Sequence, residues 1–191
     1  SGNAVQRTAV SDTATDVRRA RAVLLGSATP SNVRVGVNFV SSVVITSGAT
    51  PGSLQGVIAR FVDNNNFVFA YAGHSLLDGE FYVAAGQVLL GTSSLLGGSV
   101  LLDGLVSTDL HRLELVLLED GFWAVIVDGD LATHGTAPAL VTAQALDDGK
   151  CGILDWHTPA TACTRTFSDF RIERLPSPDA AVHPGRELLW G

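Results

Sequence analysis

The chain has 191 residues, of which 46% are hydrophobic and 16% charged, and its formal net charge is −7. This composition excludes a disordered protein, and no apolar run approaches the roughly 18 residues of a membrane helix, so we expect no membrane partner. Nucleic acid is also a poor fit, because the acidic chain has only one small basic cluster, at Arg18, Arg19 and Arg21.

The dominant pattern along the chain has a period of two residues, which is typical of β-strands. In the segment 33–39 the apolar residues Val33, Val35, Val37 and Phe39 alternate with polar or small residues, so we expect these four to face the interior. No window of similar length has convincing helical spacing. The pattern predicts an all-β protein, with weaker strand signals at 4–9, 20–25 and 98–102.

Turn signals divide the chain at short intervals, as a β-sandwich requires. Strands are predicted at 57–62 and 67–71 around the Asn-rich turn 63–66, and at 111–118 and 122–127. Asp128-Gly129 is the signal for a two-residue hairpin turn. Further strands are expected at 81–90, 150–155 and 164–175.

About a dozen strands are too many for an immunoglobulin sandwich and suit a larger jelly roll. We therefore predict one domain, residues 1–175, folded as a two-sheet antiparallel jelly-roll sandwich. Prolines at 176, 178 and 184 cannot donate to a strand ladder, so residues 176–191 are expected to form a linker or tail.

Cys151 and Cys163 flank a predicted hairpin. With its turn centred on Pro159, the two thiols would be out of register and too far apart to bond. Two separate core cysteines are therefore favoured, and a disulfide stays open as the alternative.

Three segments form a set: the hairpin 56–69 with its Asp-Asn turn, the strand pair 111–129 that ends in Asp-Gly, and the Gly-x-x-Gly of 149–152 followed by Phe167-Ser168-Asp169-Phe170. Together they resemble the concanavalin A-like lectin/glucanase superfamily in its laminin-G-like branch. The resemblance covers most of residues 20–175. It implies a concanavalin A-like sandwich and says little of function, because this fold carries lectins, hydrolases and structural modules.

A narrower resemblance rests on Val33-Arg34-Val35, the hairpin turn 63–66 and Ala180-Ala181, and the bias of eleven arginines against one lysine agrees with it. These features resemble minor tail or fibre proteins of phages that infect actinobacteria. The resemblance implies an extracellular place in the virion tail, other tail proteins as partners, a homotrimer, and host adhesion through cell-wall carbohydrate. The alternative is a secreted bacterial carbohydrate-binding module.

Catalytic motifs are missing from the sequence, so we predict that the protein is not an enzyme. Glycosidases need two carboxylates across the scissile bond, whereas the candidate strand 111–118 offers only Glu114, beside Arg112 and Val116. There is no Gly-x-Ser-x-Gly elbow, zinc-binding motif or phosphate loop. A glycoside hydrolase is the least favoured reading.

Aromatic side chains are the best candidates for carbohydrate binding, because a sugar ring has an apolar face and a hydroxyl rim. Trp156 and His157 lie in the predicted loop 155–161, where they would offer a stacking surface, unless Trp156 folds back onto the sandwich edge. Trp123 is either a platform on a sheet face or a packed core residue. Tyr71 is a weaker candidate of the same type.

A calcium ion is the one cofactor that the sequence leaves open. Asp63 and Asn64, with Asn66, could supply oxygen ligands, although a hairpin turn explains the same residues without an ion. Asp169 matches the acidic position of the closing strand in the resembling family, where relatives sometimes carry a structural calcium.

Overall fold

The computed structural model describes residues 5–9, 18–23, 31–41, 53–74, 80–137, 149–157 and 163–176. Within these ranges every regular element is a β-strand, and no helix has the length and hydropathy needed to cross a bilayer. The strands are β1 (Val5–Ala9), β2 (Arg18–Val23), β3 (Val33–Ser41), β4 (Ser53–Asp63), β5 (Asn66–His74), β6 (Phe81–Leu89), β7 (Thr92–Leu95), β8 (Val100–Leu101), β9 (His111–Leu117), β10 (Phe122–Val127), β11 (Asp130–Thr136), β12 (Lys150–His157) and β13 (Cys163–Arg174).

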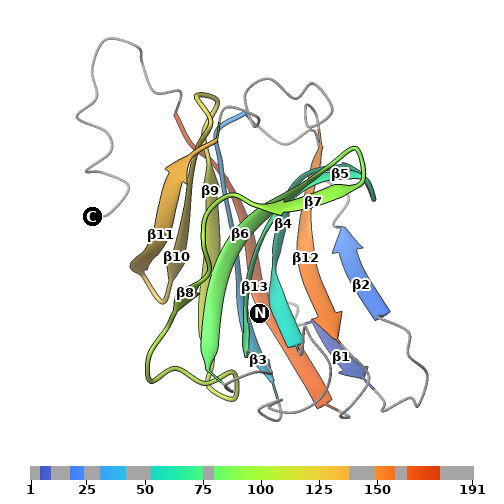
Figure 1. Cartoon of the computed structure of the whole chain (residues 1–191). Coiled ribbons are helices and arrows are strands. Elements are labelled where there is room, and N and C mark those ends of the chain that lie inside the picture. Colours follow the sequence, from blue (N-terminus) through green and yellow to red (C-terminus); the bar gives the residue numbers. More distant parts are fainter. Residues whose placement is uncertain are drawn as a thin grey trace.

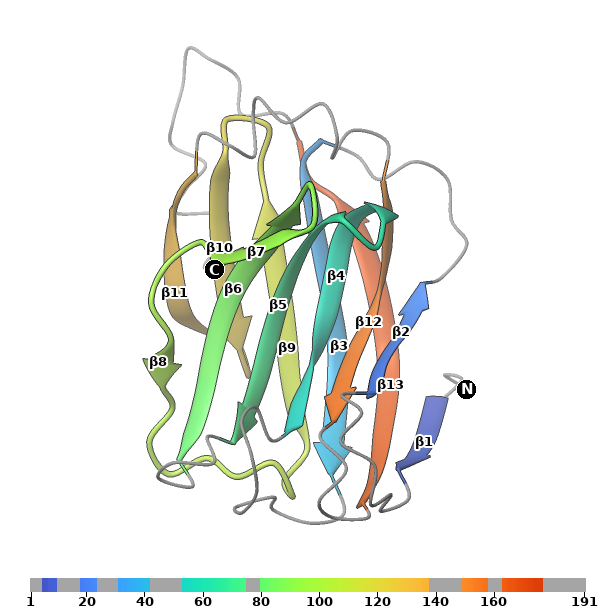
Figure 2. The ribbon, with the colours of Figure 1, turned by 45° about the vertical axis from the view of Figure 1, so that its right-hand side comes forward.

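The strands form two antiparallel sheets that face each other (Figure 1). The six-stranded sheet has the order β1-β13-β3-β9-β10-β11. The seven-stranded sheet has the order β2-β12-β4-β5-β6-β7, with β8 also paired to β6. Figure 2 shows the second sheet in front of the first, with the strands of both running roughly along the same direction. The predicted all-β, two-sheet jelly-roll sandwich is therefore confirmed.

The interior between the sheets is built from the alternating residues that the sequence indicated. Val33, Val35, Val37 and Phe39 are each fully buried, and Arg34 and Asn38 between them are partly exposed. Inward residues of β4, β5, β6, β9, β10 and β12 complete one continuous core cluster. Alternation places every second side chain of these strands in the shared layer, which keeps water out of it.

The predicted hairpins are present, and their turns have the expected backbone. Asp63 Oδ1 accepts hydrogen bonds from the Asn65 N–H at 2.7 Å and from Asn66 Nδ2 at 3.0 Å, which closes the turn between β4 and β5. Asp128 and Gly129 both have positive φ, 53° and 94°, as a primed two-residue turn requires. Asn66 also accepts the Leu90 N–H at 3.1 Å, so it joins this hairpin to the next.

The predicted hairpin between the strands that carry the two cysteines is wrong. β12 belongs to the seven-stranded sheet and β13 to the six-stranded sheet, so the chain crosses from one sheet to the other between them. Cys151 is a buried thiol in the core cluster. The Cys163 side chain lies outside the described part of the structure, as do all residues from 177 onward.

Candidate functional site

Trp123 is a core residue, so its interpretation as a sheet-face platform for a ligand is wrong. Only 2% of the residue is exposed, and it faces the interior from β10. Its ring packs against two glycines: a Cβ added at Gly97 or at Gly135 would lie 3.0 Å from ring atoms of Trp123. Glycine at both places makes room for the largest side chain of the core.

Tyr71 ends a row of aromatic rings on the outer face of the seven-stranded sheet. The row runs from Phe61 through Phe67 and Phe69 to Tyr71, with successive ring centroids about 6 Å apart. Burial raises the pKa of the Tyr71 hydroxyl, because the charged phenolate is poorly solvated there. Tyr71 is partly exposed whereas Phe67 and Phe69 are buried, so this face offers a ligand only the end of the row.

Trp156 and His157 lie in a strand, not in the predicted loop. β12 extends through both residues, and Trp156 pairs with Leu54 of β4 on one side and with Arg19 of β2 on the other. Pairing on both sides fixes their backbone within the sheet. Their side chains and residues 158–162 lie outside the described part of the structure, so sugar stacking by Trp156 stays a prediction.

The candidate calcium residues are not brought together. Asp63 and Asn64 lie at the β4–β5 turn of the seven-stranded sheet, whereas Asp169 lies in β13 of the six-stranded sheet. Asp63 accepts the hydrogen bonds that close its turn, and Asp169 accepts hydrogen bonds from Arg112 and Arg171. These residues therefore cannot share one ion, and calcium at either place stays a prediction.

A polar groove lies on the outer face of the six-stranded sheet, over β3, β9 and β13. We call it the Arg112 groove. It has a volume of about 860 Å³ and is lined by Arg34, Gly36, Arg112, Glu114, Asp169, Phe170, Arg171, Ile172 and Glu173. Three of the lining residues are arginines and three are carboxylates, so their formal charges cancel.

Arg112 is the centre of this groove and joins all three strands. Its Nε donates to Glu114 Oε1 at 2.8 Å, and its Nη1 donates to Asn38 Oδ1 at 3.1 Å and to Asp169 Oδ2 at 3.2 Å. Gly36 leaves the space for the guanidinium, because a Cβ there would lie 2.8 Å from Arg112 Nη2. The planar group is thereby fixed against the floor of the groove.

The Asp169 carboxylate is held between two arginines by an irregularity in β13. The pairing of β13 with β3 shifts register between Ser168 and Arg171, and Asp169 has a φ of 49°. Its Oδ1 accepts from Arg171 Nε at 2.8 Å, while Oδ2 accepts from Arg112. A bulge of this kind redirects a side chain that regular alternation would place elsewhere.

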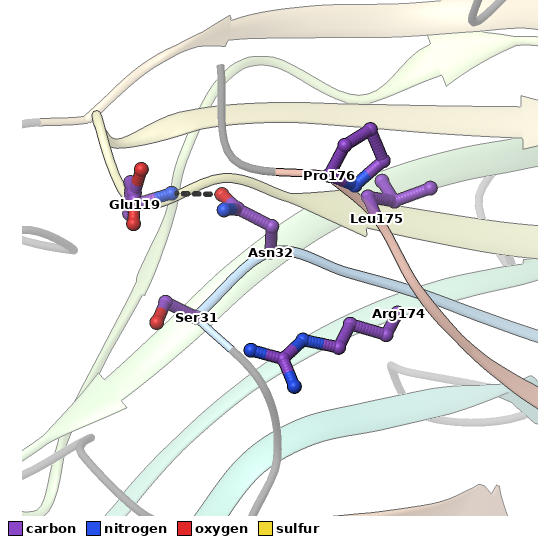
Figure 3. Close-up of a pocket in the computed structure, with 6 residues that line it drawn as sticks. All are labelled: Ser31, Asn32, Glu119, Arg174, Leu175 and Pro176. Carbon is purple, nitrogen blue, oxygen red and sulfur yellow. Dashed lines mark hydrogen bonds between the residues drawn. The ribbon is translucent and has the colours of Figure 1, made fainter. Parts of the chain in front are cut away.

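A second hollow lies at the end of the sandwich where β13 ends (Figure 3). It has a volume of about 570 Å³. Asn32 Oδ1 accepts the Glu119 N–H at 2.8 Å, and the Asn32 carbonyl accepts the Leu175 N–H at 3.0 Å. Figure 3 shows the Arg174 side chain on one side of this junction and Glu119 on the other. Asn32 thus joins three strand ends, which explains its burial without a ligand.

Sequence reasoning found Arg112 and Glu114 as neighbours on one face, and it found Asp169 separately. It missed that the three form one network, because Asp169 is 57 positions from Arg112 and reaches it only through the bulge. It also missed Arg34, Arg171 and Glu173 as members of the groove. Their alternation along two strands was the available signal, but alternating charges also describe an ordinary solvated face.

No protein-family model matches the sequence, and no curated protein matches it. Solved structures do match. One comes from work on endo-acting O-glycanases of the human gut microbiota that initiate mucin breakdown, with 11% identity, a TM-score of 0.59, and coverage of 91% of this chain and 80% of that chain. An alginate lyase, A1-II′, has 13% identity and a TM-score of 0.51, covering 79% of this chain and 65% of the lyase.

A third match is botulinum neurotoxin type C, whose path into cells depends upon interaction with two ganglioside molecules. It has 9% identity and a TM-score of 0.51, and the match covers 91% of this chain but only 44% of the toxin chain. Identities this low establish the fold alone. The chain is a jelly-roll-like β-sandwich similar to these proteins in architecture.

Proposed function

We propose that this domain is a non-catalytic, glycan-binding β-sandwich and that the Arg112 groove is its binding surface. The observation that carries the proposal is the fixed guanidinium of Arg112 between Glu114, Asp169 and Asn38, at the floor of the groove. Planar, rigidly held polar groups suit neighbouring sugar hydroxyls, which donate and accept at fixed spacing.

The charges of the groove favour an uncharged saccharide. Arg34 lies 3.9 Å from Glu173, Arg112 contacts Glu114 and Asp169, and Arg171 contacts Asp169. Every arginine that lines the groove therefore faces a carboxylate of the same groove. An anionic ligand would have to approach these carboxylates without gaining an uncompensated cation, so neutral hydroxyl-rich ligands are the better match.

Binding without hydrolysis is favoured by the hydrogen bonds of the two carboxylates. Glu114 and Asp169 both accept from Arg112, which has donors and no acceptor. An inverting or retaining glycosidase needs one carboxylic acid that donates a proton to the leaving oxygen. The sharing of one guanidinium by two carboxylates supports a binding role for this network over an acid–base role.

The similar structures support a glycan ligand only through their fold. The similar structures come from work on O-glycanases of mucin breakdown, from an alginate lyase, and from a neurotoxin that interacts with gangliosides. We extend the proposal to a tail or fibre module of a phage virion that adheres to the host cell wall, with other tail proteins as partners and a trimeric assembly. The support is the sequence resemblance and the arginine bias. The alternative, a secreted bacterial carbohydrate-binding module, would use the same groove.

The proposal is tested by measuring binding of the chain to neutral and anionic glycans on one array, followed by calorimetry on the best ligand. Arg112→Gln should weaken binding by at least about tenfold, because several charge-assisted hydrogen bonds and the network they hold are lost. Arg174→Gln removes the same charge from an exposed position of β13 outside the groove and should change affinity little.

Two outcomes would overturn the proposal. Equal loss of binding in both variants would show a general charge effect, and undiminished binding in Arg112→Gln would place the site elsewhere. Release of new reducing ends from any bound polysaccharide would show that the domain is an enzyme.

A further inference from the structure

The C-terminal half of β13 is an open sheet edge within the part of the chain that the structure describes. β1 pairs with β13 only from Cys163 to Phe167, whereas β3 pairs with it as far as Arg174. Figure 2 shows β1 beside one end of β13 only. Among the described strands, residues 168–174 therefore have a neighbour on the β3 side alone. An open edge presents N–H and C=O groups that can pair with another strand.

The backbone of this edge is oriented for pairing at Ile172. The Leu175 N–H donates to the Asn32 carbonyl, which continues the β13–β3 ladder, at 3.0 Å. In an antiparallel ladder every second residue bonds to the same neighbouring strand, so Glu173 and Arg171 also direct their backbone groups toward β3. Ile172 lies between them and therefore directs its N–H and C=O to the open side.

The side chains of this edge are exposed, including an apolar one on the inner face of the sheet. Ile172 pairs with Val35, which is fully buried in the core, and yet 45% of Ile172 is exposed. The Arg171 and Glu173 side chains point to the outer face and are 69% and 60% exposed. Among the described residues, Ile172 thus lacks the cover that Val35 has, although the two share one face.

The sequence of this edge is complementary to itself in an antiparallel register. When two copies pair about a twofold axis at Ile172, Arg171 of each copy faces Glu173 of the other, and Ile172 faces its own counterpart. Opposite charges directly across a strand pair are stabilising and like charges are destabilising. Moving the axis by one residue sets Arg171 against Arg171 or Glu173 against Glu173. The axis at Ile172 avoids both and brings together the backbone groups that point to the open side.

We propose that the domain associates with a second copy of itself through residues 171–173 of β13, which joins two six-stranded sheets into one continuous sheet. The contact is isologous, so both copies contribute the same segment, and it closes with two copies. A trimer would have to form through another surface. The paired segment is short, and interfaces well below about 1,000 Å² are weak, so we expect a dissociation constant between about 10 μM and 1 mM.

The proposed dimer places the two Arg112 grooves side by side. Residues that face each other across a strand pair point to the same side of a sheet, so both grooves open on one face. Arg171 and Glu173 line the groove of their own copy, and in the dimer each also borders the groove of the second copy. This consequence for ligand binding rests on the proposed glycan function, whereas the association itself does not.

The direct test is sedimentation velocity of the intact chain over a concentration series, without any ligand. The wild type should change from monomer to dimer as its concentration rises. Ile172→Lys sets two positive charges against each other at the axis and should weaken association by at least about tenfold. Leu131→Lys is the matched control, because it introduces the same charge at a 41% exposed position on β11, the opposite edge of the sheet. It should leave association unchanged.

Charge reversal tests the register. Arg171→Glu alone, or Glu173→Arg alone, sets like charges across the strand pair twice and should weaken association by at least about tenfold. The double variant reverses both members of each pair, so association should return to within about threefold of the wild type. The double variant loses both the contact with Asp169 and the contact with Arg34 that the single variants lose one at a time. Its recovery therefore cannot come from better folding.

A wild type that stays monomeric up to about 1 mM would overturn the proposal. So would a dimer that Ile172→Lys leaves intact, a double variant no better than the single ones, or a loss of association in Leu131→Lys. Failure of the proposed function gives a different result. An Arg112→Gln variant that binds glycans as well as the wild type would refute the groove as the binding site, while the association measured without ligand would stand.

Discussion

The two ends of the sandwich interior are built from different chemistry. At the end where β3 begins, most inward residues are apolar and fully buried, as with Val33, Leu115 and Leu117, and the buried Arg60 donates to the Ser31 carbonyl there at 2.8 Å. At the end where β3 finishes, the inward residues include Gln55, Asp155, Arg165, His74 and His111, all at most 4% exposed. Both ends are buried, but the first, which we call the apolar end, is stabilised mainly by burial of apolar side chains. The polar end depends on each group meeting its partner.

The pair Asp155–Arg165 shows what that dependence means. Asp155 is on β12 of one sheet and Arg165 is on β13 of the other, and a salt bridge joins them across the interior. The pair therefore links the two sheets at the polar end of the interior. Burial of both charges costs solvation, so we infer that the pair specifies how the sheets align more than it adds stability.

The largest expected effect comes from breaking this pair on one side. Asp155→Ala leaves the Arg165 guanidinium buried without its carboxylate and should destabilise the fold by about 3–5 kcal/mol, measured by urea unfolding. The double variant Asp155→Leu with Arg165→Met should recover most of the loss, since no charge then remains. A double variant as unstable as the single one would show that the salt bridge itself stabilises the fold.

The apolar end should respond through packing alone. Leu115→Ala removes a fully buried side chain from the core cluster and should cost about 2–5 kcal/mol, through lost burial and the cavity left behind. Leu131→Ala makes the same change at a site that is 41% exposed and should stay within about 0.5 kcal/mol. Both values come from thermal or urea unfolding. Equal effects in the two variants would contradict the proposed core.

The same contrast decides what could be predicted from the sequence. The inward apolar face of β3 was predictable, because Val33, Val35, Val37 and Phe39 repeat every second residue and only a strand places them on one face. The hairpin turns were predictable as well, because Asp128-Gly129 and the turn at Asp63 use residues that tolerate positive φ or cap their own backbone. These signals are local.

The polar end and the groove were not predictable, because they depend on contacts between distant segments. Asp155 at an inward position looks like any charged residue on a solvated strand face, and only its partner across the interior reveals its burial. The crossing of the chain between β12 and β13 leaves no local mark, so the two were predicted as one hairpin. β7 was missed because all four residues of Thr92–Leu95 are exposed and show no apolar alternation.

A subtler test of the polar end uses Ser41, which pairs with Arg165 in the sheet. Only 3% of Ser41 is exposed, and the Ser41 Oγ has no hydrogen-bond partner among the described residues. Ser41→Ala should therefore be neutral or stabilise the fold by up to about 1 kcal/mol, because a buried hydroxyl without a bond is removed. Ser94→Ala, at an exposed site in β7, serves as the control in the same unfolding assay. A loss above 1 kcal/mol would mean that the hydroxyl is bonded after all.

The smallest expected effect concerns the outer face of the seven-stranded sheet, where the Tyr71 hydroxyl is a polar group that is buried only in part. Burial raises the pKa of Tyr71, so its hydroxyl should keep its proton above the ordinary value of about 10. A group whose pKa is raised by folding contributes its full stabilising free energy at pH values below its pKa in the unfolded chain. That contribution is lost as pH rises through its pKa in the folded chain. Stability should therefore decline above about pH 10, and less so in Tyr71→Phe.

The measurement is an ultraviolet titration of the two tyrosines of the chain in the folded state. The wild type should contain a component that ionises late, and Tyr71→Phe should remove that component while leaving the signal of Tyr82. Phenylalanine keeps the ring stacked on Phe69, whose centroid lies 6.0 Å from that of Tyr71, so the row of rings survives. If the late component persists in Tyr71→Phe, the outer face does not shield this hydroxyl, and the row of rings is open to solvent to its end.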